Sequence, residues 1–122
     1  KSMLELLPGK EFKITLKNGE VIEGKFSVWA YKRFCMKLGL SDKKLVARLS
    51  EDESSWSDNI EMILCAVEHK QREKGEAFKF TDFHACQWVE EIGGIGSENY
   101  VKLISHAGSE LEPSGEKKTE AI

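Results

Sequence analysis

Cysteine and histidine are the residues of this chain best suited to chemistry, as metal ligands or as a nucleophile with its base. His84 and Cys86 lie close together in the sequence, and His106 follows in the next predicted helix. Structural zinc sites use Cys-x-x-Cys pairs or histidines one helical turn apart, and the sequence contains neither spacing. On a helix, His84 and Cys86 would point to different faces. We therefore expect no bound metal and no cofactor.

The three cysteines, Cys35, Cys65 and Cys86, are also the candidate thiol nucleophiles. A reactive thiolate needs a helix N-terminus or neighbouring cations that lower the pKa of the thiol. Each of these cysteines instead lies within an apolar helical pattern, and their odd number and wide spacing do not suggest a disulfide framework. We expect all three to be reduced and buried, which is typical of a cytoplasmic protein. No convergent acid, base and nucleophile are recognisable, so the sequence predicts no enzyme.

Two further stretches have the composition of ligand-binding loops without their pattern. Glu51, Asp52 and Glu53 form an acidic run, but a calcium-binding loop alternates its ligands and places a glycine at its centre. The stretch Gly93-Gly94-Ile95-Gly96 follows a predicted helix and lacks the Gly-Lys-Ser/Thr of a phosphate-binding loop. We interpret the first stretch as a solvated loop and the second as a turn between two helices.

The candidate partner-binding residues are Trp29, Lys32, Arg33 and Met36, on the side of a predicted helix that faces away from its apolar stripe. Aromatic and basic side chains can stack on and neutralise a nucleic acid. Tryptophan, methionine and arginine are also enriched where proteins contact one another. The chain has 18 basic and 21 acidic residues, which argues against a nucleic-acid partner. We prefer a protein partner; the alternative is a small α+β nucleic-acid-binding or regulatory module.

The elements that position these residues begin with a predicted β-hairpin at 10–26. Apolar residues alternate on both sides of Asn18-Gly19, as in half-buried strands. A two-residue loop would place charged residues opposite apolar ones, whereas a three-residue loop with Gly19 in the left-handed conformation keeps one face apolar. We predict the second register. It pairs Phe12 with Gly24 and Ile14 with Ile22.

Apolar residues that recur every three to four positions predict helices along the rest of the chain. Ser27, Thr81 and Ser97 are placed as N-caps, and glycines follow several helices as stops. The predicted helices cover 27–38, 41–49, 57–74, 81–92 and 97–107. Their predicted core-facing residues are, in that order, Val28, Tyr31, Cys35 and Leu38; Leu45, Val46 and Leu49; Ile60, Ile63, Leu64 and Val67; Phe83, Cys86, Val89 and Ile92; and Tyr100, Val101, Leu103 and Ile104.

The segments around these elements differ in charge and apolar content. Residues 3–7 predict either one helical turn or a leading strand. Residues 68–74 are charged, so we expect that end of the third helix to project into water. Segment 109–122 cannot bury enough apolar surface to offset its chain entropy, and we expect a disordered, charged tail. The prediction is thus a single α+β domain at 1–108, a hairpin packed on four to five helices. No apolar run reaches the roughly 18 residues of a membrane span.

The order of these elements resembles that of the tail assembly chaperones of long-tailed bacteriophages and prophages. The resemblance is carried by a hairpin that ends in Lys25-Phe26-Ser27 and a helix that ends in Lys37-Leu38-Gly39-Leu40. An apolar helix at 60–67 and a threonine-capped helix at 81–92 complete it. The resemblance spans 12–92. The chain departs from short family members by the charged extension of its third helix and by its fifth helix.

The resemblance implies a binding protein without catalytic activity. Such chaperones coat the tape measure protein in the cytoplasm of the infected host, help to recruit tail tube subunits, and are not retained in the virion. A chaperone for a long helical client is suited by apolar surface that binds a helix or a second subunit. We therefore expect a cytoplasmic homo-oligomer that associates through the hairpin edge or the first helix.

Overall fold

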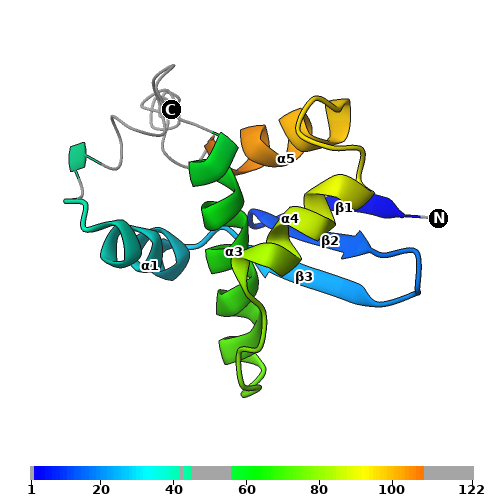
Figure 1. Cartoon of the computed structure of the whole chain (residues 1–122). Helices are drawn as coiled ribbons and strands as arrows, with labels where there is room; N and C mark the ends of the chain where they lie inside the picture. Colours follow the sequence, from blue (N-terminus) through cyan, green and yellow to red (C-terminus); the bar gives the residue numbers. More distant parts are fainter. Residues whose placement is uncertain (1, 42, 45–55, 109–122) are drawn as a thin grey trace, which may run out of the picture.

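The computed structural model describes residues 2–41, 43–44 and 56–108. In this part of the chain a three-stranded antiparallel sheet packs against four helices, which confirms the predicted α+β class (Figure 1). The predicted tail at 109–122 and most of the predicted helix at 41–49 lie outside the described residues. The elements are β1 (Met3–Leu7), β2 (Glu11–Thr15), β3 (Val21–Lys25), α1 (Val28–Leu38), α3 (Trp56–Glu73), α4 (Asp82–Glu91) and α5 (Glu98–Gly108).

The hairpin of β2 and β3 has the predicted register, with Phe12 opposite Gly24 and Ile14 opposite Ile22. Its turn is closed by hydrogen bonds, and Gly19 has a φ of 92°, which a residue without a side chain adopts readily. Gly24 is required for a second reason. A Cβ atom at this position would lie only 2.6 Å from Cε2 of Phe12, whose side chain is fully buried.

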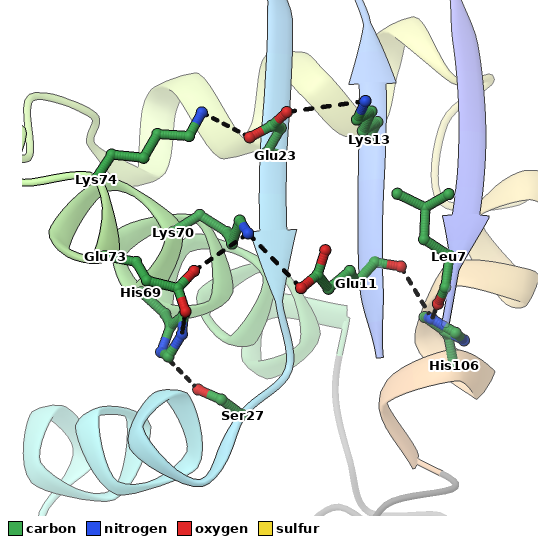
Figure 2. Close-up of polar contacts among 10 residues, drawn as sticks. All are labelled: Leu7, Glu11, Lys13, Glu23, Ser27, His69, Lys70, Glu73, Lys74 and His106. Carbon is green, nitrogen blue, oxygen red and sulfur yellow. Dashed lines mark hydrogen bonds and ion pairs between the residues drawn. The ribbon is translucent and has the colours of Figure 1, made fainter. Parts of the chain in front are cut away.

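Residues 3–7 form a strand, the second of the two predicted alternatives, so the sheet is larger than a hairpin. β1 pairs with β2, placing Leu4 opposite Ile14 and Leu6 opposite Phe12. The sheet order β1-β2-β3 leaves β1 at one edge. His106 of α5 joins this edge to the rest of the fold, because its Nε2 atom lies 3.1 Å from the carbonyl oxygen of Leu7 and 3.0 Å from that of Glu11 (Figure 2).

Helix α3 passes through the middle of the fold and contacts β3, α1 and α4 (Figure 1). Its four predicted core residues are all buried, which confirms the predicted apolar face. One core cluster joins the sheet to every described helix. Its fully buried aromatic side chains are Phe12, Phe26 and Phe34. Partly buried Phe78 and Phe80, between α3 and α4, pack against the same cluster.

The prediction that the charged end of α3 projects into water holds for only part of it, because residues 72–74 are exposed whereas Glu68 is buried and residues 69–71 are half-buried. Lys70 Nζ lies 3.6 Å from Glu11 Oε2, and Lys74 Nζ lies 2.6 Å from Glu23 Oε1 (Figure 2). Glu23 also faces Lys13 at 4.0 Å. The long lysine stems cover protein surface while their ammonium groups reach carboxylates of the strands. This half of α3 is therefore held by complementary charge.

Helix α4 is rotated about its axis relative to the prediction. Ala85, Trp88, Val89 and Ile92 are buried, whereas Phe83 is 65% exposed and Cys86 is exposed. The reason is Trp88, which is 2% exposed and stacks edge-on against Phe80 with ring centroids 5.0 Å apart. Burying the largest side chain of the helix turns Phe83 and Cys86 outward.

Two other predicted core residues are exposed. Val28 on α1 and Val101 on α5 are 79% and 57% exposed. On α5 the inward row is formed by Tyr100, Leu103 and Ala107, and Ile104 is half-buried.

Candidate partner-binding surface

Helix α1 carries the predicted partner-binding residues, and its ends are set as the sequence predicts. The Ser27 Oγ atom accepts a hydrogen bond of 3.0 Å from the Ala30 amide, and Gly39 has a φ of 67° after the last turn. Two contacts fix how the helix is rotated. Phe34 is fully buried, and the hydroxyl of buried Tyr31 donates to the Ala107 carbonyl of α5 at 2.7 Å.

Trp29 and Arg33 lie on the side of α1 that faces α3. The Trp29 ring centroid is 6.1 Å from that of His69, and the Arg72 guanidinium lies over the Trp29 ring at 5.3 Å. Arg33 Nε donates to Glu68 Oε1 at 3.1 Å. These two predicted site residues therefore already have partners within the chain.

Glu68 is the centre of this contact between α1 and α3. Its side chain is 3% exposed, and its second oxygen accepts from Arg72 Nε at 3.2 Å. A buried carboxylate is tolerated when charged donors satisfy it, and here two guanidinium groups do so. The charged composition of 68–74 predicts that Glu68 lies in a solvated end of the helix. The burial of Glu68 could be predicted only from the packing of α1 against α3, which places Arg33 opposite Glu68.

The outer row of α1, formed by Val28, Lys32 and Met36, is open to solvent. The three residues are spaced four apart, which places them on one face. Val28 is 79% exposed, Met36 is 63% exposed, and Lys32 is exposed. The structure thus divides the four predicted residues into two outward ones, Lys32 and Met36, and two that face α3. It adds Val28, which the spacing from Lys32 and Met36 could have revealed.

A hollow of about 360 Å³ adjoins the C-terminal end of α1. Its apolar lining comes from α1, α3 and the segment before α4: Leu38, Leu64, Phe78 and Phe80. Charged and polar residues also line it: Lys37, Glu61, Thr81 and Asp82. Lys37 and Glu61 form an ion pair with each other.

A second hollow of about 220 Å³ lies between β3 and the C-terminal end of α3, and it is lined mainly by charged residues. Lys74 and Glu23 in its wall form an ion pair, and Gln71 donates to Glu76 at 3.4 Å. The hydrogen bond from Lys74 holds the pKa of Glu23 below its ordinary value of 4.5, although partial burial acts in the opposite direction. Lys74 and Glu23, which carry opposite charges in this wall, are therefore already paired with each other.

Ser27, His69 and Glu73 contain the residue types of a hydrolytic triad. Ser27 Oγ lies 2.8 Å from His69 Nδ1, and His69 Nε2 lies 3.5 Å from Glu73 Oε2 (Figure 2). The Ser27 hydroxyl also accepts the α1 capping bond, and neither hollow is lined by it. We interpret the group as a connection between the start of α1 and the charged end of α3.

The remaining candidates for chemistry are the cysteines, His84 and the stretch 93–96. Burial raises the pKa of the Cys65 thiol to about 12, which disfavours a reactive thiolate. Cys35 and Cys65 are buried as predicted, but the prediction that Cys86 is buried was wrong. His84 accepts from the Thr81 amide at 3.0 Å through Nδ1, at the start of α4. The stretch 93–96 is the predicted turn between two helices, with Gly93 and Gly94 at φ of 123° and 91°.

Within the described residues, no group of three or more histidine, cysteine, aspartate or glutamate side chains is arranged to hold a metal ion. No described helix combines the length and apolar character needed to cross a membrane. The acidic run at 51–53 lies outside the described residues. No protein-family model, no curated protein and no solved structure matches the chain.

Proposed function

We propose that this chain is a non-enzymatic tail assembly chaperone of a long-tailed phage or prophage, which binds the tape measure protein in the host cytoplasm. The family assignment comes from the order of elements and the sequence patterns at 12–92. The observation that supports it is the outer row of α1, where Val28 and Met36 are mostly exposed on either side of Lys32. Two exposed apolar residues at helical spacing are suited to contact a helical client, with Lys32 between them.

The alternative, a nucleic-acid-binding module, draws less support from the same helix. Base stacking requires an accessible aromatic face, and Trp29 is covered on one side by Arg72 and packed near His69. Arg33 is paired with the buried Glu68. Of the basic residues in the predicted site, Lys32 is the one left exposed, and one cation contributes little to phosphate binding.

The proposal predicts a tape measure gene in the neighbourhood of the gene for this chain, and co-expression of the two products tests it. Wild-type chain should keep that client soluble and co-purify with it, because the outer row of α1 covers an apolar helix. Met36→Glu should reduce the co-purified client about tenfold or more, the effect of a central interface residue. The matched control is Val101→Glu, which changes a similarly exposed residue on α5 and should have no effect.

Three outcomes would remove the proposal. The gene neighbourhood could lack tail tube and tape measure genes. The client could stay insoluble with the wild-type chain. The chain could instead bind DNA or RNA with a steep salt dependence that Lys32→Glu abolishes, which would favour the nucleic-acid module.

A further inference from the structure

Helix α1 carries three basic side chains and no acidic one. They are Lys32, Arg33 and Lys37. Arg33 and Lys37 form ion pairs with Glu68 and Glu61 of α3. Among the residues that the structure describes, no acidic side chain forms an ion pair with Lys32. The charge of Lys32 is therefore available to a partner.

The contact between α1 and α3 beside Lys32 adds to this positive charge. Glu68 is shared by two guanidinium groups, with Arg33 Nε at 3.1 Å and Arg72 Nε at 3.2 Å, so one carboxylate faces two positive charges. The Arg72 side chain is 60% exposed and lies over the Trp29 ring at 5.3 Å. Trp29 and Lys32 are three positions apart on α1, which makes them neighbours on the helix surface. Lys32 and Arg72 thus give this surface an excess of positive charge.

Lys32 also lies between two exposed apolar side chains. Val28 and Met36 are each one turn away from it on the same face, and they are 79% and 63% exposed. A partner that covers both would also displace water from the ammonium group between them. A cation that loses water needs an anion in place of the water, because an unpaired charge is costly to bury. A partner that covers the outer row must therefore combine apolar surface with an acidic group.

A nucleic acid and an acidic segment of a protein both carry negative charge. A phosphate backbone has no apolar surface for Val28 and Met36, so it would match Lys32 alone. In an amphipathic helix, side chains one turn apart lie on one face, which is also the spacing of the outer row. Such a helix can contact the lysine and both apolar residues at once, so the observations favour a protein helix.

We propose that the segment bound by α1 is an amphipathic helix with an acidic residue opposite Lys32 and an apolar residue about one turn to either side of it. The inference rests on the proposed function, whose site it shares, and it adds the chemistry of the client segment. The excess positive charge at Arg72 increases the preference of the same surface for an acidic segment.

Overlapping peptides that cover the tape measure protein, with binding followed by fluorescence anisotropy, test this chemistry. For the tightest-binding peptide, Lys32→Glu should lower the affinity about thirtyfold or more, because it opposes like charges. Lys32→Met should lower it about tenfold although it extends the apolar row, because the peptide carboxylate is left unpaired. Lys102→Glu, the same change at an exposed lysine of α5, is the matched control and should bind like the wild type. Circular dichroism establishes that the variants are folded.

A charge reversal in the peptide identifies the pair directly. Replacing its acidic residue by lysine should weaken binding to the wild-type chain and restore binding to Lys32→Glu.

Four results would overturn the inference: a Lys32→Met variant that binds as tightly as the wild type, a reversed peptide that restores nothing, a tightest-binding peptide without an acidic residue, or a DNA duplex that binds more tightly than any peptide. In the first three cases, a loss of peptide binding in Met36→Glu would still support the proposed function. If the wild-type chain bound none of the peptides, the proposed function would fall together with the inference.

Discussion

In the second half of α3 a charged side chain is buried, whereas in the first turn of α4 an aromatic side chain is exposed. Glu68 on α3 is charged and 2% exposed, whereas Phe83 on α4 is aromatic and 65% exposed. The two helices contact each other. The difference lies in the neighbours that each side chain meets.

Glu68 meets two guanidinium groups, from Arg33 on α1 and from Arg72 on its own helix. These charged hydrogen bonds replace the water that the carboxylate loses on burial. Phe83 competes with Trp88 for the inward side of a short helix, and Trp88 has both the larger apolar area and the aromatic neighbour Phe80. Whether a side chain is buried therefore depends on the partner available at its position as well as on its residue type.

Within α4, replacing Trp88 is expected to destabilise the fold far more than replacing Phe83. Trp88→Ala should lower the free energy of unfolding by about 4 kcal/mol, because it empties a 2% exposed site in the core. Phe83→Ala should change it by less than about 0.5 kcal/mol, as for a surface position. Urea unfolding followed by circular dichroism measures both. Protein is kept dilute, so that self-association does not add to the stability of the wild type. Equal losses would contradict the rotation of α4.

An intermediate effect is expected at Glu68. Glu68→Gln should lower the free energy of unfolding by about 2 kcal/mol, because the neutral amide loses two charge-assisted hydrogen bonds in a buried place. The matched control on the same helix is Glu73→Gln. That side chain is 50% exposed, and its interactions with Lys70 and His69 are screened by water, so a much smaller loss is expected. If both variants lose the same stability, Glu68 does not organise the contact between α1 and α3.

Local signals in the sequence were sufficient for much of this fold. The alternation of apolar residues around Asn18-Gly19 predicted the register of β2 and β3, which the pairing of Ile14 with Ile22 confirms. Ser27 and Ser97 cap α1 and α5 as predicted, with hydrogen bonds of 3.0 and 3.1 Å. Both features are determined within a few residues of the chain, so pattern and spacing are enough to find them.

What could not be predicted depends on contacts between distant segments. The rotation of α4 follows from Trp88 meeting Phe80, and the burial of Glu68 follows from α1 lying beside α3. The four predicted site residues were divided for the same reason. Trp29 and Arg33 find partners on α3, which leaves Lys32 and Met36 outward. The helical pattern separates the core-facing side of α1 from its other side. It does not say whether α3 will cover the row of Trp29 and Arg33 or the row of Lys32 and Met36 on that other side.

The smallest expected effect concerns the ion pairs that join the charged end of α3 to the sheet. The hydrogen bond from Lys74 lowers the pKa of Glu23 in the folded chain below its ordinary value of 4.5. Glu23 is therefore a weaker base when folded than when unfolded. Its contribution to stability is fully present above the unfolded pKa and is lost as the pH falls through the folded pKa. The stability difference between wild type and Glu23→Gln should be constant above about pH 5 and shrink at lower pH.

The variant Lys74→Met provides the control for this pH dependence. Without the ammonium at 2.6 Å, Glu23 retains Lys13 at 4.0 Å, so the pH dependence of the Glu23→Gln difference should become weaker but not vanish. Urea unfolding of the four chains between pH 3 and pH 7, arranged as a double-mutant cycle, measures the coupling directly. A coupling that is absent at neutral pH would mean that Lys74 does not hold Glu23 in solution. The position of the second half of α3 would then depend on Glu68 and its two arginines. The last turn of the helix would behave as a solvated end, without an ion pair from Lys74 to the sheet.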